Sequence, residues 1–128
     1  MRAKDLMMGD YISIKPSGMP IKIAAVHHKK VAYHATINKL TWIRESLLEP
    51  IPLTPKVLEK NGFETQPNIG YIIDDWDGTQ IIYDSWNYNL RIIKNYKVCL
   101  DIEIFDNIAV HELQHALRLC GIEKEIVL

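Results

Sequence analysis

The segment His111-Glu112-Leu113-Gln114-His115 is the part of this chain whose residue types and spacing could do chemistry. It spells H-E-x-x-H, and two histidines four residues apart lie on one face of a helix, where both imidazoles can bind the same metal ion. Glu112 would then act as the general base of a zinc-dependent hydrolase. The motif therefore makes zinc the cofactor to consider and Glu112 the catalytic candidate.

The residues around the motif predict which way its helix faces. At about 100° per residue, five side chains fall within one apolar stripe, which predicts the buried side. These are Val110, Leu113, Ala116, Leu117 and Cys120. His111 and His115 lie almost opposite the stripe, so we expect both to point away from the core of their own domain.

A catalytic zinc site also needs a third protein ligand. Only thirteen residues follow His115, and Arg118 stands where the extended metzincin motif has glycine. Three more histidines lie far upstream, and nothing in the sequence brings them to the helix: His27, His28 and His34. We therefore interpret the motif as a solvated polar helix face and keep a metal site at His111 and His115 as the alternative.

Two clusters outside the helix are candidate binding surfaces. His27-His28-Lys29-Lys30 is a basic turn whose Lys29 and Lys30 could contact phosphate, although a simple hairpin tip is the favoured interpretation. Aromatic residues near acidic turns could form a recognition surface for protein or carbohydrate, or could instead line a small core. The candidates are Trp76, Trp86 and Tyr88.

The elements that position these residues begin with short strands. Alternating segments separated by turns occur four times, at residues 11–14, 21–26, 31–35 and 40–43. Gly9-Asp10 forms the turn that opens the series. Strands of this length and spacing predict a small SH3-like barrel or a strongly curved sheet over residues 1–48.

A connector helix is predicted early in the second part, residues 49–128. Thr54 is a typical N-cap, Pro55 fits the first helical position, and Asn61-Gly62 ends the helix after about two turns. The helix links the N-terminal strands to the rest of the chain. It carries no candidate site.

A β-meander and a final helix follow the connector. Asp77-Gly78 is a strong hairpin turn, and we expect three or four antiparallel strands around it. Asp106 or Asn107 caps a last helix that runs to about Cys120. The whole pattern predicts an α+β fold, mostly antiparallel β, as two parts or as one compact domain.

Bulk composition limits the classes of function. The 128 residues are 48% apolar and 24% charged, with a net charge of −1, so no overall positive charge attracts nucleic acid. No apolar run is long enough to span a bilayer and no signal peptide follows Met1, so we expect a cytoplasmic protein without a membrane partner. We expect Cys99 and Cys120 to be buried reduced thiols, with a disulfide as the alternative.

Three stretches resemble a family of uncharacterised small proteins from Bacteroides-type gut bacteria and their phages or mobile elements. Residues 48–64 are similar to its "PIPLT…L…GF" segment, residues 110–123 to its "VHxLQ…L.G.E" ending, and residues 6–10 to its "L.xGD" start. The resemblance implies no activity and no catalytic residue. It implies that relatives carry Gln and Asn in place of Glu112 and His115, which makes the metalloprotease spelling incidental.

We therefore predict a non-enzymatic accessory or binding protein of phage or mobile-element type that holds no cofactor. A protein partner is favoured over nucleic acid. The first alternative is the zinc-dependent hydrolase, and the second is a nucleic-acid-binding module that uses Lys22, Lys29 and Lys30.

Overall fold

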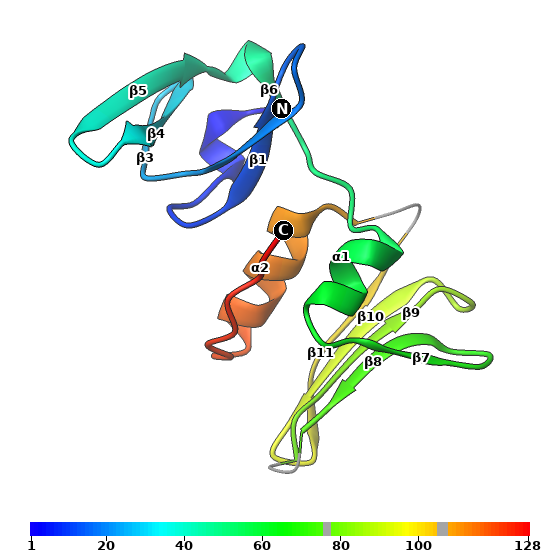
Figure 1. Ribbon diagram of the computed structural model, residues 1–128. Helices are drawn as coiled ribbons and strands as arrows, with labels where there is room; N and C mark the ends of the chain where they lie inside the picture. Colours follow the sequence, from blue (N-terminus) through cyan, green and yellow to red (C-terminus); the bar gives the residue numbers. More distant parts are fainter. Residues whose placement is uncertain (76–77, 105–107) are drawn as a thin grey trace. The chain divides into compact units, whose positions relative to one another are not determined.

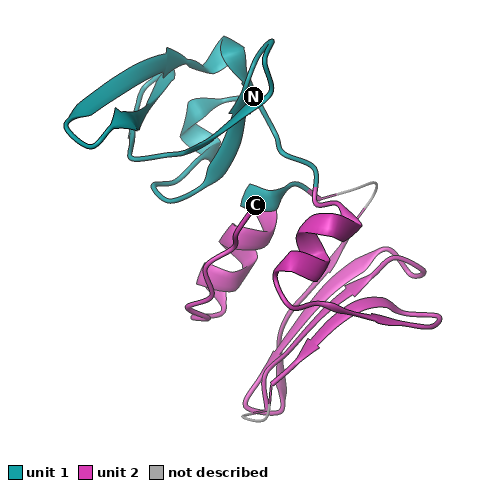
Figure 2. Ribbon diagram, in the orientation of Figure 1, with its two compact units in different colours: residues 1–52, 109–111 teal, residues 53–108, 112–128 magenta. Residues whose placement is uncertain are grey.

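The computed structural model describes residues 1–75, 78–104 and 108–128, and the chain divides into two compact units. Unit 1 comprises residues 1–52 and 109–111, and unit 2 comprises residues 53–108 and 112–128 (Figure 2). We expected the first part of the chain to end at residue 48, and the main boundary of unit 1 lies at residue 52. The short segment 109–111, which we placed in the second part, clusters with unit 1.

Unit 1 contains two three-stranded antiparallel sheets (Figure 1). β1 (Tyr11–Ile14), β2 (Met19–Lys22) and β6 (Leu48–Glu49) form the first sheet, in the order β2-β1-β6. β3 (Ala25–His27), β4 (Lys30–Thr36) and β5 (Lys39–Arg44) form the second, in the order β3-β4-β5. Two short 3-10 helices complete the unit, η1 (Ala3–Asp5) and η2 (Glu45–Leu47).

The described residues form no closed barrel, so the predicted SH3-like barrel is not supported. β2 and β3 follow each other in the chain but pair in different sheets, which leaves the two sheets separate at this point. One apolar core nevertheless joins residues of both sheets and of η1. Its buried members are Ala3, Leu6, Ile12, Ile21, Ile23, Val31 and Leu48.

Unit 2 is a five-stranded antiparallel meander with two helices (Figure 1). The strands lie in the order β11-β10-β9-β8-β7, so each pairs with its neighbour in sequence. They are β7 (Glu64–Gln66), β8 (Gly70–Asp74), β9 (Gln80–Asp84), β10 (Asn89–Lys94) and β11 (Lys97–Glu103). The helices are α1 (Pro55–Lys60) and α2 (Val110–Leu119). The predicted α+β fold with mostly antiparallel strands is thus confirmed.

The connector helix α1 forms for the reasons visible in the sequence. The Thr54 hydroxyl accepts a hydrogen bond from the Val57 N–H at 3.3 Å, and Pro55 occupies the first turn. At the other end, Gly62 has a φ of +89°, in the left-handed region that ends many helices. Asn61 is buried there, and its amide bonds the backbone of Val57 and of Val127.

Helix α2 begins at Val110, slightly later than predicted, and Gly121 follows its end with a φ of +67°. The expected capping residues, Asp106 and Asn107, lie outside the described residues, as does Asp77 of the predicted hairpin turn. In the described part of the chain, no helix has the length and apolar character needed to cross a bilayer.

Candidate functional site

Helix α2 carries the H-E-x-x-H motif, and its predicted apolar stripe is buried. Each of the five stripe residues is at most 5% exposed: Val110, Leu113, Ala116, Leu117 and Cys120. The interpretation of the motif as a solvated polar face is wrong for His111, which is only 9% exposed, whereas His115 is half-buried and Glu112 exposed. The Val110 N–H, in the first turn of α2, donates to the Ile51 carbonyl at 2.8 Å.

The part of the chain that the structure describes shows no metal site around the motif. Within residues 1–75, 78–104 and 108–128, no three His, Cys, Asp or Glu side chains lie together as a metal ion would require. Of the upstream histidines, His27 lies in β3, His28 in the following turn and His34 in β4. Zinc chemistry at His111, Glu112 and His115 therefore remains a hypothesis based on sequence spacing alone.

The aromatic candidates of unit 2 lie mostly in one turn. Trp76 lies outside the described residues, but Trp86 and Tyr88 lie between β9 and β10 and are 65% and 60% exposed. The Asp84 carboxylate accepts hydrogen bonds from the N–H groups of Trp86 and Asn87, at 3.0 and 2.9 Å, and so forms the turn. Burial acts to raise the pKa of Asp84, but the hydrogen bonds from Asn87 and Trp86 outweigh it and lower this pKa overall.

The polar residues beside this turn bond to one another. Asn89 donates to the Asp101 carboxylate at 2.8 Å, and Arg91 forms an ion pair with it at 3.1 Å. The hydrogen bond from Asn89, followed by the bond and charge of Arg91, lowers the pKa of Asp101. A pocket of about 280 Å³ lies here, lined by Ile82, Asp84, Asn87, Asn89 and Arg91. Because these groups already satisfy one another, we interpret this surface as structural.

The basic turn of unit 1 connects β3 to β4, and strand register extends it into a larger surface. His27 lies opposite Lys30, and Lys30 lies opposite Arg44 of β5. Trp42 lies two residues from Arg44 along β5, and so on the same side of the sheet, because side chains alternate along a strand. We call these four residues, His27, Lys30, Trp42 and Arg44, the basic face.

The indole of Trp42 is the centre of the basic face. It is 43% exposed, and Lys30 Nζ stands 5.1 Å from its ring centroid, a cation–π arrangement. The His27 ring meets the indole edge-on at 6.4 Å between centroids, and the His28 ring lies 4.3 Å from that of His27. Ala32, the register partner of Trp42, is fully buried. The sheet therefore presents an aromatic platform flanked by cations.

The two parts of the chain differ sharply in charge. Residues 1–52 contain eight basic and four acidic residues, whereas residues 53–128 contain seven basic and twelve acidic ones. Residues 11–44 contain no Asp or Glu but six Lys or Arg: Lys15, Lys22, Lys29, Lys30, Lys39 and Arg44. Lys15 pairs with Glu49 at 3.9 Å. By contrast, no carboxylate of the described residues forms an ion pair with Lys29, Lys30, Lys39 or Arg44.

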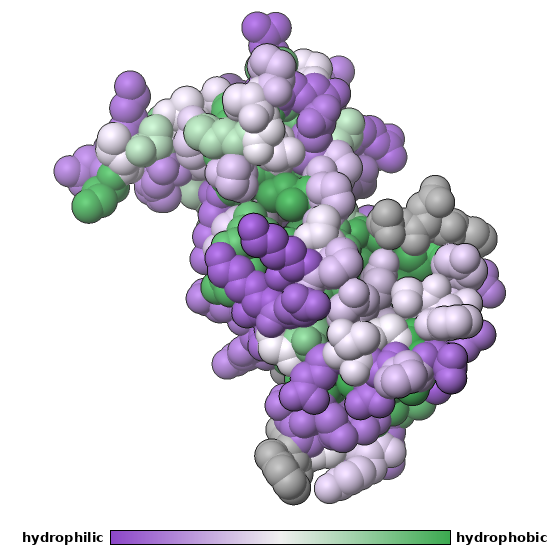
Figure 3. All heavy atoms as spheres, turned by 45° about the vertical axis from the view of Figure 1, so that its right-hand side comes forward, coloured by the Kyte–Doolittle hydropathy of each residue, from purple (hydrophilic) through white to green (hydrophobic). Residues whose placement is uncertain are grey.

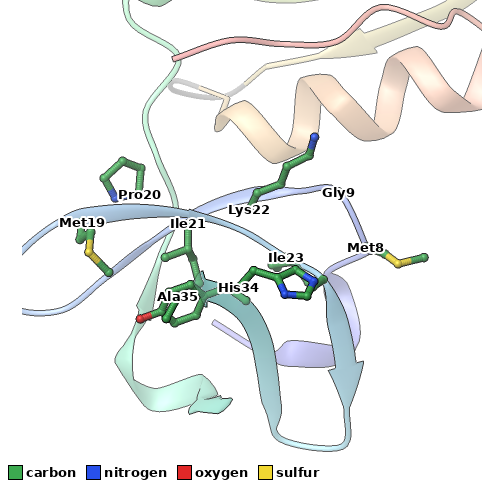
Figure 4. Close-up of a pocket in the computed structure, with 11 residues that line it drawn as sticks. Met8, Gly9, Met19, Pro20, Ile21, Lys22, Ile23, His34 and Ala35 are labelled. Atoms are coloured by element: carbon green, nitrogen blue, oxygen red, sulfur yellow. The ribbon is translucent and has the colours of Figure 1, made fainter. Parts of the chain in front are cut away.

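A pocket of about 500 Å³ lies in the same unit (Figure 4). The pocket is lined, mainly with apolar side chains, by Met8-Gly9, by β2 and the two residues after it, and by the second half of β4. The lining side chains include Met8, Met19, Ile21, Ile23, Tyr33, His34 and Ala35. Figure 4 shows the His34 imidazole on one side of β2 and the Lys22 side chain pointing to the other side.

Sequence reasoning named Lys29 and Lys30 but missed Trp42, Arg44 and the pocket. The signal for the basic face was the absence of acidic residues from position 11 to 44, which the net charge of the whole chain conceals. The cysteine prediction is corrected as well: Cys120 is buried, but Cys99 is exposed. Burial, together with the neighbouring Cys99 thiol, raises the pKa of Cys120 to about 12.

Comparison with known proteins adds no relative to this picture. No protein-family model, no curated protein and no solved structure matches the chain.

Proposed function

We propose that this protein is a non-enzymatic binding protein and that unit 1 binds nucleic acid through the basic face. One observation carries the proposal: Trp42 is exposed on a sheet beside the paired residues Lys30 and Arg44, in a stretch of chain that contains no carboxylate. Cations neutralise phosphates and release their counterions, and an exposed aromatic ring stacks on a base. The basic face can thus bind both the phosphate and the base of a nucleotide.

From composition we expected a protein partner rather than nucleic acid, and this proposal reverses that preference. A near-zero net charge disfavours nucleic acid only if the charges are evenly spread, and here the basic residues concentrate in unit 1. A protein interface would favour a broad apolar patch. On the face that Figure 3 shows, the hydrophobic residues form small areas separated by hydrophilic ones.

A phage or mobile-element origin remains part of the proposal. It is supported by the resemblance of residues 6–10, 48–64 and 110–123 to such proteins. A small accessory protein that binds nucleic acid is compatible with that origin.

Binding to labelled single-stranded and duplex oligonucleotides, measured by fluorescence anisotropy at several salt concentrations, tests the function. We expect affinity to fall steeply with salt. For three to four neutralised phosphates, the slope of log K against log salt should be about −2 to −3 with single strands and about −3 to −4 with duplex. The double variant Lys30→Glu, Arg44→Glu should lose binding at 0.1 M salt, a concentration at which charges near the surface are only partly screened (~10 Å Debye length).

The matched control is Lys56→Glu, Lys124→Glu, which makes the same change in net charge on unit 2. It should bind almost as the unchanged protein does. Equal losses in the two double variants would mean that only net charge matters. Absence of any salt-dependent binding would remove the proposal.

The zinc-dependent hydrolase is tested separately, by elemental analysis of tag-free protein. We expect far less than one zinc per chain, and no change on His111→Ala or His115→Ala. Stoichiometric zinc that is lost in either variant would instead assign the motif to metal binding.

A further inference from the structure

The pocket of unit 1 lies beside an open edge of β4. β3 pairs with β4 only from Lys30 to Ala32, so beyond Ala32 this edge of β4 has no strand neighbour among the described residues. Main-chain N–H and C=O groups on such an edge can bond a ligand that carries donors and acceptors of its own.

The side chains of the pocket suit a flat apolar ligand. Met8 and Met19 are 71% and 44% exposed, and both are flexible thioethers that adapt to the faces of aromatic rings. Ile21 and Ile23 provide a buried apolar floor. The His34 ring lies on the same side of β2 and can stack with a ring or donate to it (Figure 4). No lining residue is acidic.

We propose that this pocket accepts one unstacked base of a single-stranded nucleic acid, an inference that rests on the proposed function. A base is planar, has two apolar faces and carries hydrogen-bonding groups along its edges, which matches a pocket with an apolar lining and an open strand edge. The base is attached to a phosphate, which matches the surrounding positive charge. A duplex keeps its bases stacked and cannot fill the pocket without unpairing one.

The register of β4 and β5 connects the pocket to the basic face. Trp42 lies opposite Ala32, and His34 follows two residues along β4 on the same side of the sheet. Diagonal neighbours of this kind are about 7–8 Å apart. A single-stranded nucleic acid can therefore stack one base on Trp42 and place a nearby base in the pocket.

The experiment fills the pocket without touching the basic face. Ala35 is exposed and lines the pocket, whereas the next residue, Thr36, is exposed and does not. Ala35→Trp should weaken binding of a labelled single-stranded 12-mer about tenfold and leave duplex affinity unchanged, because it removes the site for one base. Thr36→Trp adds the same bulk outside the pocket and should leave both affinities unchanged. Circular dichroism of the two variants confirms that each remains folded.

An abasic strand, which keeps its sugars and phosphates, provides the second arm. The unchanged protein should bind the abasic oligonucleotide more weakly than the intact one. The abasic oligonucleotide should bind Ala35→Trp and the unchanged protein with equal affinity. Undiminished single-strand affinity in Ala35→Trp would overturn the base pocket while salt-dependent binding still supported the proposed function. A third outcome is that an extended peptide displaces the oligonucleotide from the unchanged protein but not from Ala35→Trp. This would show that the open edge of β4 binds peptides by β-strand addition, and it would also overturn the base pocket.

Discussion

Unit 1 and unit 2 each expose a tryptophan, but the polar groups around these two residues behave differently. Near Trp86, Asp84 bonds the turn backbone and Asn87, and Arg91 pairs with Asp101. Near Trp42, the cations Lys30 and Arg44 form no ion pair with a carboxylate of the described chain. The two surfaces thus carry similar residue types, but the polar side chains near Trp86 bond to one another, whereas the cations near Trp42 form no ion pair.

The difference shows why an exposed aromatic is a weak indicator of a binding site by itself. Polar groups that already bond to one another must lose those bonds before they contact a ligand, so they contribute little net affinity. Cations that form no ion pair do not have to break one before they bind an anion. We therefore place the proposed binding site on unit 1 and interpret the polar face of unit 2 as structural.

The largest expected effect is on stability and lies in unit 2. Leu90 is fully buried in β10, and Leu90→Ala should lower the free energy of unfolding by about 2–5 kcal/mol, since it removes apolar contacts and leaves a cavity. Val98→Ala, at a residue that is 61% exposed, should cost far less. Urea denaturation followed by circular dichroism measures both. Similar losses would contradict a core on this side of the meander.

The tryptophans give the most direct test of the comparison. Trp42→Ala should weaken single-strand binding by about 1–3 kcal/mol, the usual contribution of one stacked base, whereas Trp86→Ala should leave the affinity unchanged. Trp42→Phe keeps a ring and should recover part of the loss. Fluorescence anisotropy at one fixed salt concentration measures all three variants. A larger effect at Trp86 would move the proposed site to unit 2.

A smaller effect, on reactivity, separates the two cysteines of unit 2. The thiolate is the reactive form, and Cys120 is buried with a pKa raised to about 12, so it stays protonated at pH 8 and should react with iodoacetamide very slowly. The exposed Cys99 should be alkylated first. Mass spectrometry of timed samples gives the order of reaction, and equal rates would show that Cys120 is accessible.

The same group makes stability depend on pH. Because the pKa of Cys120 is raised in the folded protein, its contribution to the free energy of unfolding should be lost as the pH rises above about 9.

Local patterns predicted the elements of this protein well. Thr54 and Pro55 start α1 as expected, and the buried stripe of α2 was visible from residue spacing alone, because caps and helical periodicity depend on neighbours within a few residues. The burial of His111 was not visible. Next to it, the Val110 N–H bonds the Ile51 carbonyl, and these two residues are far apart in the sequence.

The sequence by itself therefore determined the α+β class, the connector helix, the meander and the absence of acidic residues from position 11 to 44. Only the tertiary structure decided that Trp42 lies beside Lys30 and that β4 keeps an open edge next to β2. Turns and helix ends follow from local backbone preferences, whereas strand register and the choice of edge strands follow from long-range packing of the whole unit.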